Sequence, residues 1–138
     1  MSEQRAQEVA VTFAEGVRDD VASLTESTDE TADTVEVDAL KRRIAELLVE
    51  CKANPYIGEL MGHGRHPELA DCRRVRFDIP SHKGRPRFRL IYRNEPSDGA
   101  PAECRWLAIA PRASLQAHRK ARQRGQATSA SQTPHRRK

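Results

Sequence analysis

The fold of this chain is decided by the stretch Asp71-Cys72-Arg73-Arg74-Val75-Arg76-Phe77-Asp78-Ile79 and by Arg87-Phe88-Arg89-Leu90-Ile91-Tyr92-Arg93. In both stretches, apolar residues alternate with arginines at the two-residue period of a strand. Lys83-Gly84-Arg85-Pro86 lies between them and has the composition of a turn. We therefore predict an antiparallel hairpin, one face of which carries five arginines: Arg74, Arg76, Arg87, Arg89 and Arg93.

Such a face is costly without an anionic partner, because like charges directly opposite in a sheet are destabilising. The distribution of charge along the chain agrees with this interpretation. Residues 1–50 contain 5 Lys/Arg and 13 Asp/Glu, whereas residues 51–138 contain 19 and 7. Concentrated positive charge is typical of proteins that bind nucleic acids. A surface that is merely solvated is the alternative, but it does not explain why the two signs separate along the chain.

The remaining residues predict a mixed α+β domain. We expect strands over residues 9–13 and 103–110 and helices over 14–24, 37–52 and 114–123. This is the order β-α-α-β-β-β-α, with the helices packed on one face of a small, mostly antiparallel sheet. A single domain is expected over residues 1–125, with an acidic flexible loop at 25–34 and a disordered basic tail at 126–138.

Other sequence features exclude several classes of protein. The three cysteines, Cys51, Cys72 and Cys104, are odd in number and widely spaced, which favours buried thiols in a reducing, cytoplasmic compartment. No apolar run is long enough to span a membrane. His63 and His66 with Cys72 lack a fourth ligand and the spacing of a zinc site. We therefore expect no metal and no small-molecule cofactor.

Several motifs together resemble the RelE/ParE superfamily of toxin–antitoxin systems, and in particular its ribosome-dependent mRNA interferases. The resemblance covers residues 8–124 and leaves the acidic loop and the tail outside it. The motifs are the leucine-rich helix ending in Asn54-Pro55, Leu60-Met61-Gly62, the strand from Asp71 to Phe77, Phe88-Arg89-Leu90-Ile91-Tyr92, and Ile109-Ala110-Pro111-Arg112 followed by Ala121 and Arg122.

This resemblance implies a toxin of a type II system that cleaves mRNA in the ribosomal A site and is neutralised by an acidic antitoxin. Its partners would be mRNA, the ribosome and that antitoxin. In RNA-cleaving members, basic residues surround the scissile phosphate, and an aromatic residue or histidine completes the site. The matching catalytic positions here are Arg89, Arg112 and His118, and the RNA-binding ones are Arg74 and Arg76, to which Arg87 is added from its place in the hairpin.

Two departures from the family pattern affect the expected chemistry. This sequence has arginine where lysines are common and histidine where tyrosine is common. Arginine stabilises developing negative charge but does not exchange protons at neutral pH. His118 can do so, and we expect it to act as general acid or as general base.

The residues singled out in the sequence also have structural interpretations. His118 and Arg89 could be ordinary surface residues, and for Arg93 a solvent-facing strand position is the favoured interpretation. Tyr92 and Trp106 are expected in the core rather than stacked on bases. For the whole protein, the alternatives are a non-catalytic ParE-like toxin that binds a protein such as DNA gyrase, and a plain nucleic-acid-binding module.

Overall fold

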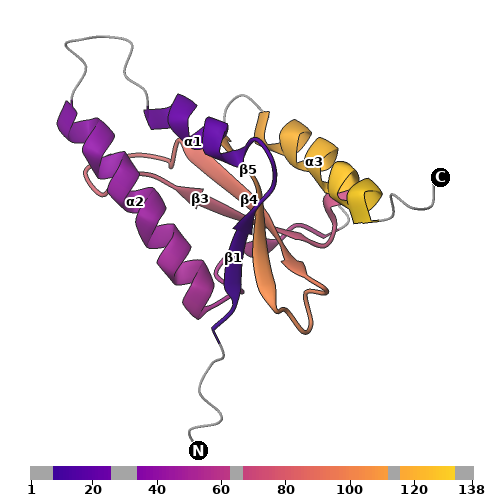
Figure 1. The fold of residues 1–138 in the computed structure, drawn as a ribbon. Helices are drawn as coiled ribbons and strands as arrows, with labels where there is room; N and C mark the ends of the chain where they lie inside the picture. Colours follow the sequence, from indigo (N-terminus) through magenta and orange to yellow (C-terminus); the bar gives the residue numbers. More distant parts are fainter. Residues whose placement is uncertain (1–7, 26–33, 63–66, 112–115, 133–138) are drawn as a thin grey trace, which may run out of the picture.

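The computed structural model describes residues 8–25, 34–62, 67–111 and 116–132 (Figure 1). It confirms the mixed α+β class and the expected order of the main helices and strands, and it adds a two-residue strand and a short 3₁₀ helix. The elements are β1 (Ala10–Phe13), α1 (Val17–Thr25), α2 (Thr34–Ala53), β2 (Glu59–Leu60), η2 (Pro67–Leu69), β3 (Cys72–Phe77), β4 (Phe88–Glu95), β5 (Glu103–Pro111) and α3 (Gln116–Gln132).

The five strands form one sheet in the order β1-β5-β4-β3-β2. β1 runs parallel to β5, and all other neighbouring strands are antiparallel. The predicted hairpin is present, with Val75 opposite Leu90 and Arg76 opposite Arg89. Gly84 has a φ of 113° in the connecting turn, a backbone conformation that favours glycine.

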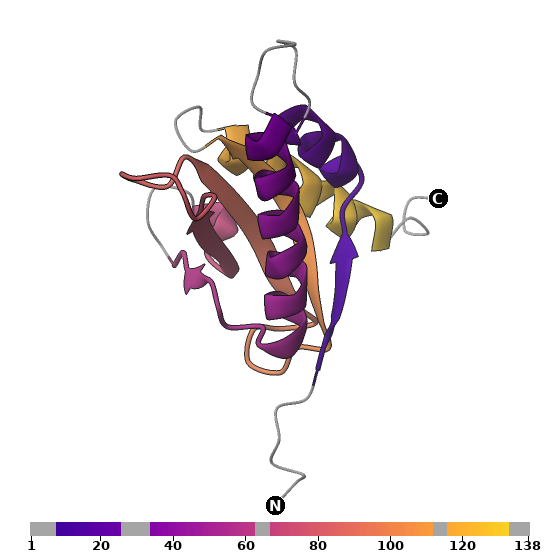
Figure 2. The ribbon, with the colours of Figure 1, turned by 90° about the vertical axis from the view of Figure 1, so that its left-hand side faces the viewer.

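Helices cover both faces of this sheet, so the prediction that they pack on one face was wrong. α2 lies on the face of Tyr92, whose hydroxyl donates a hydrogen bond to the carbonyl of Pro55 just after α2. α3 lies on the opposite face, where its His118 contacts Arg89. Figure 2 shows α2 across the front of the sheet and α3 behind it. We call the α3 side, with Arg74, Arg76, Arg89 and Arg93, the arginine face.

The arginine face accepts a helix because part of it is apolar. Ile91 of β4 stands opposite Ala108 of β5 in the register of the sheet, and both are fully buried. On α3, Ala117 and Ala121 are buried in turn. Small side chains on both partners allow close packing, which the pattern of arginines in β4 does not reveal.

The hydrophobic core lies between α2 and the sheet. Leu40, Ile44, Leu47 and Cys51 of α2 recur at helical spacing and are all buried, as the sequence predicts. Trp106 packs edge-on against Phe13, with ring centroids 5.5 Å apart, and Tyr92 is fully buried. The predicted core positions of both Tyr92 and Trp106 are therefore confirmed. The three cysteines are free and buried, again as predicted.

The C-terminal helix departs from prediction at its end. The sequence predicts a last helix over residues 114–123, but α3 continues through Gly125 to Gln132. The first residues of the segment 126–138, predicted to be a disordered tail, are therefore helical, and residues 133–138 lie outside the described part of the chain. Residues 26–33, most of the predicted acidic loop, lie outside it as well. None of the helices in the described ranges is both long and apolar enough to cross a membrane.

Candidate active site

Arg89 and His118 meet beneath the start of α3. The Arg89 Nη1 atom lies 2.9 Å from Nδ1 of His118 and 3.4 Å from its Nε2. β4 carries the arginine, and the first turn of α3 carries the histidine. Only 7% of Arg89 and 5% of His118 are exposed. The structure thus brings two of the three predicted catalytic residues together, while the third, Arg112, lies outside the described residues.

The geometry of this contact places the guanidinium of Arg89 against the face of the imidazole. One Arg89 nitrogen lies within 3.4 Å of both ring nitrogens, whereas a donor in line with the in-plane lone pair of one nitrogen would lie much farther from the other. Arg89 therefore holds the imidazole in place and does not fix which ring nitrogen carries the proton.

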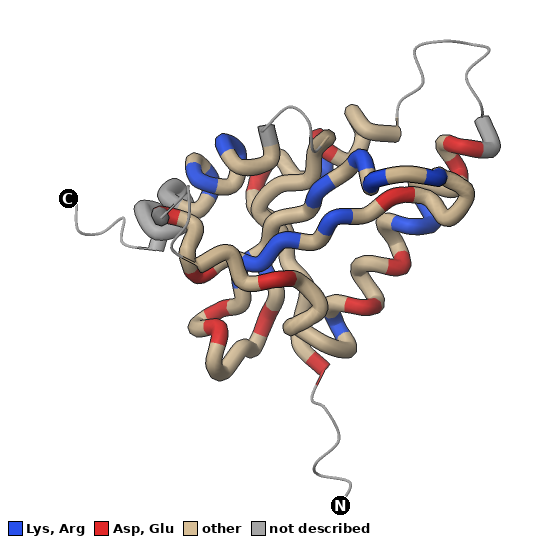
Figure 3. Tube along the Cα trace, turned by 180° about the vertical axis from the view of Figure 1, so that it is seen from behind, with Lys and Arg blue, Asp and Glu red and all other residues tan. Residues whose placement is uncertain are grey.

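Two further arginines of β3 lie on the same face, Arg76 exposed and Arg74 mostly buried. Arg76 stands directly opposite Arg89 in the sheet and is exposed. Arg74, one position further along the face, donates from Nη2 to Oε1 of Glu59 at 2.9 Å, and this hydrogen bond lowers the pKa of Glu59. Figure 3, which views the molecule from behind, shows basic residues along neighbouring strands of the sheet. An anion approaching the site would meet Arg76 first.

Arg87, the third predicted RNA-binding residue, is held elsewhere. Its guanidinium forms ion pairs with Asp78 at 2.8 Å and with Glu36 of α2 at 3.3 Å. Burial alone would raise the pKa of Asp78, but hydrogen bonds from the side chain and backbone of Arg87 and from the backbone of Ile79 outweigh it and lower that pKa to about 2. Because α2 lies on the other face, the structure does not bring Arg87 together with Arg89 and His118.

Arg93 lies on the arginine face but is paired within its own strand. Its Nη2 lies 2.8 Å from Oε2 of Glu95, and its Nη1 lies close to Gly125 of α3. It is partly buried rather than an open solvent-facing residue. The structure thus separates Arg93 from the pair of Arg89 and His118 by about four residues of strand, roughly 13 Å.

Sequence reasoning missed a carboxylate beside α3. Oε2 of Glu68, in η2, accepts a hydrogen bond from Nη1 of Arg122 at 3.1 Å. Arg122 lies one helical turn after His118, so this carboxylate stands next to the same side of the helix. A carboxylate can accept a proton, which none of the arginines can do. The irregular residues 56–70 gave no pattern from which this contact could be predicted.

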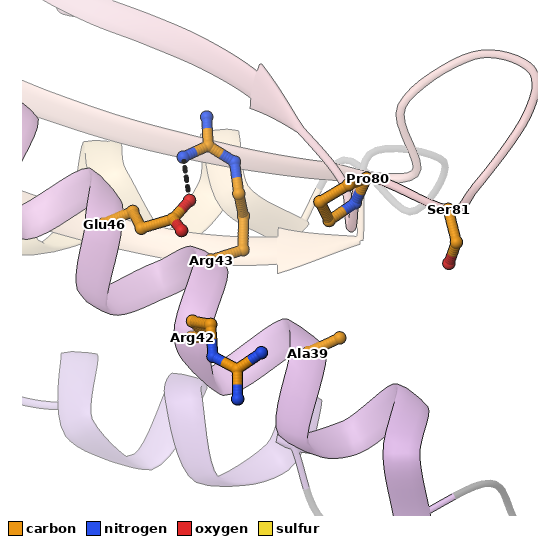
Figure 4. Close-up of a pocket in the computed structure, with 6 residues that line it drawn as sticks. All are labelled: Ala39, Arg42, Arg43, Glu46, Pro80 and Ser81. Atoms are coloured by element: carbon orange, nitrogen blue, oxygen red, sulfur yellow. Dashed lines mark hydrogen bonds and ion pairs between the residues drawn. The ribbon is translucent and has the colours of Figure 1, made fainter.

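A hollow of about 230 Å³ lies between α2 and the residues after β3, lined by Ala39, Arg42, Arg43, Glu46, Pro80 and Ser81 (Figure 4). Arg43 is paired there with Glu46 at 3.1 Å, on the side of the sheet away from α3.

In the described ranges, no group of three or more His, Cys, Asp or Glu residues could hold a metal ion. His63 and His66 lie outside those ranges.

Comparison with known proteins identifies the fold. No family model matches the sequence, and no curated protein matches it. A solved structure of the E. coli toxin RelE, with two arginines replaced by alanine and in the free state, matches with a TM-score of 0.50. The match covers 85% of this chain and 97% of that one, at 15% sequence identity. The fold is RelE-like.

The RelE-like fold confirms the structural part of the resemblance drawn from the motifs. Residues of three separate elements, β3, β4 and α3, are placed on one face of the sheet by this fold. The likeness is one of architecture, because a fold can carry several functions. What the site does must therefore be argued from its own residues.

Proposed function

We propose that this chain is the toxin of a type II toxin–antitoxin system and that it cleaves mRNA in the ribosomal A site without a metal. One observation supports the proposal most directly: Arg89 and His118 meet on the arginine face of a RelE-like fold. A fixed positive charge and a proton-exchanging group in contact are what cleavage of a phosphodiester by its own 2′-hydroxyl requires.

The residues divide the reaction between them. Arg76 and Arg74, on the same face, bind the phosphates on either side of the scissile bond through their fork of donors. Arg89 stabilises the negative charge that develops as the 2′-oxygen attacks phosphorus. Arg112 has a position in the sequence that fits the same role. The acidic antitoxin would neutralise the toxin by occupying this basic face, and the protein would act in the cytoplasm.

Proton transfer falls to His118. When a phosphate oxygen takes over the hydrogen bonds of Arg89, the imidazole of His118 accepts a proton from solvent, and the charged ring then donates a proton to the departing 5′-oxygen. The 2′-hydroxyl needs a base as well, and Glu68, a ribosomal group or water could supply it. Because Arg89 and His118 are almost fully buried, binding of RNA has to move the start of α3 or the two side chains.

The same burial favours a second candidate function, in which the protein binds nucleic acid and cuts nothing. A histidine held by an arginine can be a purely structural contact, and the exposed arginines would then be the whole functional surface. A non-catalytic toxin that binds a protein target, as ParE-like toxins do, has the same appearance. These alternatives share one expectation: exposure to the protein leaves mRNA intact.

The test is to supply the purified protein to ribosomes programmed with a defined mRNA and to analyse the ends of the products. We expect cutting in the A site, with the 5′ fragment ending in a 2′,3′-cyclic phosphate or its 3′-phosphate hydrolysis product, because the attacking group is the RNA's own 2′-hydroxyl. Intact mRNA would contradict the proposal and favour the second candidate. A 3′-hydroxyl end would mean that the mechanism is wrong.

A further inference from the structure

Asp20 of α1 is a buried carboxylate that the proposed reaction does not use. Only 3% of the residue is exposed, yet it receives hydrogen bonds from three directions. Lys120 Nζ donates to it at 2.9 Å, and Arg124 donates from Nη1 at 2.7 Å and from Nη2 at 3.2 Å. The backbone N–H of Ile109 donates at 3.2 Å. One carboxylate thus joins α1, α3 and β5.

Asp20 accepts a hydrogen bond from the backbone of β5 at a point where β1 does not pair with that strand. β1 pairs with only the first half of β5, from Glu103 to Trp106. Further along that strand, the N–H of Ile109 is satisfied by Asp20 instead of by a strand neighbour. Arg124 also donates from Nη1 to the carbonyl of Leu107 at 2.9 Å. The middle of α3 is therefore tied to β5 both directly and through Asp20.

Gly16 leaves the room that this arrangement needs. It has a φ of 97°, and a Cβ atom built on it would lie 2.7 Å from Nη2 of Arg124. The guanidinium of Arg124 thus passes over the turn before α1 to reach Asp20. Among the groups that face Asp20, both charged ones are positive. Burial alone would raise the pKa of Asp20, but the hydrogen bonds from Arg124, Lys120 and Ile109 outweigh it and leave that pKa below its ordinary value.

The apolar contacts of α3 fix its position on the sheet less specifically than the ion pairs with Asp20 do. The side chains it buries against the sheet include Ala117 and Ala121, and methyl groups bury little area and interlock weakly. His118 lies between these alanines and only two residues before Lys120. A slide or rotation of α3 would therefore carry the imidazole away from Arg89.

We propose that Asp20 is a positioning residue for the site: by holding Lys120 and Arg124 it sets the position of α3 on the sheet, and thereby the contact between Arg89 and His118. The effect on cleavage rests on the proposed function. The effect on His118 does not. The hydrogen bonds of Asp20 come from Lys120, Arg124 and the backbone of Ile109, so Asp20 acts on His118 through α3.

The test replaces Asp20 by asparagine, which keeps the shape and removes the charge, and uses the exposed neighbour Asp19→Asn as matched control. Ring nitrogens of His118 are followed by ¹H–¹⁵N NMR, with His118→Gln to assign the signals. In Asp19→Asn we expect the His118 ring signals of the wild type. In Asp20→Asn we expect these signals to shift, because the ring moves away from the guanidinium of Arg89, and we expect cleavage slower by about 10²-fold, the order expected for a small misplacement of a reacting group.

The NMR measurement tests the positioning role of Asp20, and the cleavage measurement tests the proposed function separately. If the wild type cleaves no RNA, the proposed function is wrong, but the His118 signals still decide the positioning role. Unchanged His118 signals in a folded Asp20→Asn protein would overturn that role, whatever happens to cleavage. If circular dichroism shows that Asp20→Asn is unfolded, Lys120→Met, which removes one of the two cations, replaces it. An unchanged His118 spectrum in that variant overturns the proposal equally.

Discussion

Arg89 is held between the sheet and α3, and this burial governs how it can be tested. An Arg89→Ala variant would remove a donor to His118 and leave a cavity in the sheet, so a loss of activity would not separate chemistry from stability. Arg76, directly opposite and exposed, offers a cleaner experiment. Its side chain can be shortened without disturbing the core.

We expect Arg76→Gln to weaken binding of single-stranded RNA and to make it less dependent on salt. Each phosphate contact to a single strand contributes about −0.7 to the slope of log K against log salt, so the slope should become shallower by about that amount. Arg42→Gln, an exposed arginine on α2, is the control and should change nothing. Equal slopes for Arg76→Gln and wild type in a fluorescence titration would remove Arg76 from the RNA-binding surface.

The ion pair of Asp78 and Arg87 predicts how stability responds to acid. Folding lowers the pKa of Asp78 from 3.8 to about 2, so its contribution is fully present above about pH 4 and is lost as the pH falls towards 2. We expect Arg87→Gln to reduce the free energy of unfolding by about 1 kcal/mol at pH 7, after allowance for the solvent exposure of Arg87. Urea unfolding followed by Trp106 fluorescence measures it.

Arg85, in the turn between β3 and β4, supplies the control for the unfolding measurement on Arg87→Gln. Arg85→Gln changes the same charge nearby, and its side chain is exposed, so its unfolding free energy should match the wild type at every pH. The difference between Arg87→Gln and wild type should shrink towards zero near pH 2. A difference that stays constant from pH 7 to pH 2 would show that Asp78 does not carry the effect.

Two glycines report on how tightly separate elements are packed. A Cβ atom on Gly58, before β2, would lie 2.9 Å from Cε1 of Tyr92 and 3.0 Å from Cβ of Arg73. On Gly125, inside α3, it would meet the mobile end of Arg93 at 3.2 Å. We expect Gly58→Ala to destabilise the fold by about 1–3 kcal/mol through overpacking. Gly125→Ala should be neutral or stabilise it by up to about 1 kcal/mol through helix propensity.

Chemical denaturation measures the free energy of unfolding of Gly58→Ala and Gly125→Ala, and each variant is the control for the other. A Gly125→Ala protein as unstable as Gly58→Ala would mean that α3 packs more closely on β4 than the 3.2 Å approach to Arg93 indicates. A Gly58→Ala protein as stable as the wild type would mean that the connection from α2 to β2 can shift away from Tyr92.

The elements that the sequence predicts well are those with a strong period. The buried stripe of α2, from Leu40 to Cys51, and the alternation in β3 and β4 were both found where expected. α3 was harder, because its buried residues are alanines and a histidine rather than large apolar side chains. Neither its side of the sheet nor its passage through Gly125 follows from local propensity.

The site was predictable only in part, for a related reason. Arg89 and His118 were both predicted to be catalytic residues, because the resemblance to the RelE/ParE superfamily marks their positions. The contacts of Asp20 with Lys120, and of Glu68 with Arg122, join residues about 100 and 54 positions apart. No period or spacing along the chain indicates such pairs. Arg87 was assigned to RNA by alternation alone, and its pairing with Glu36 of α2 was equally invisible.

Across the whole molecule, charge and architecture point to the same surface. The acidic first part of the chain forms α1 and α2, and the basic remainder forms β3, β4, β5 and α3. α2 covers the face opposite to the arginine face, so the separation of charge along the sequence becomes a partial separation in space. We expect such a surface to attract a polyanion and to orient it towards β3 and β4.

The most direct test of the account is the rate of mRNA cleavage in single turnovers on programmed ribosomes, comparing wild type with His118→Gln. Glutamine approximates the volume of the imidazole and can still meet Arg89, but it does not exchange protons. His82→Gln, in the turn after β3, is the control and should cleave at the wild-type rate. We predict that His118→Gln slows cleavage by about 10²–10⁴-fold while ribosome affinity stays the same. Cleavage by His118→Gln at the wild-type rate would contradict the assignment of this site.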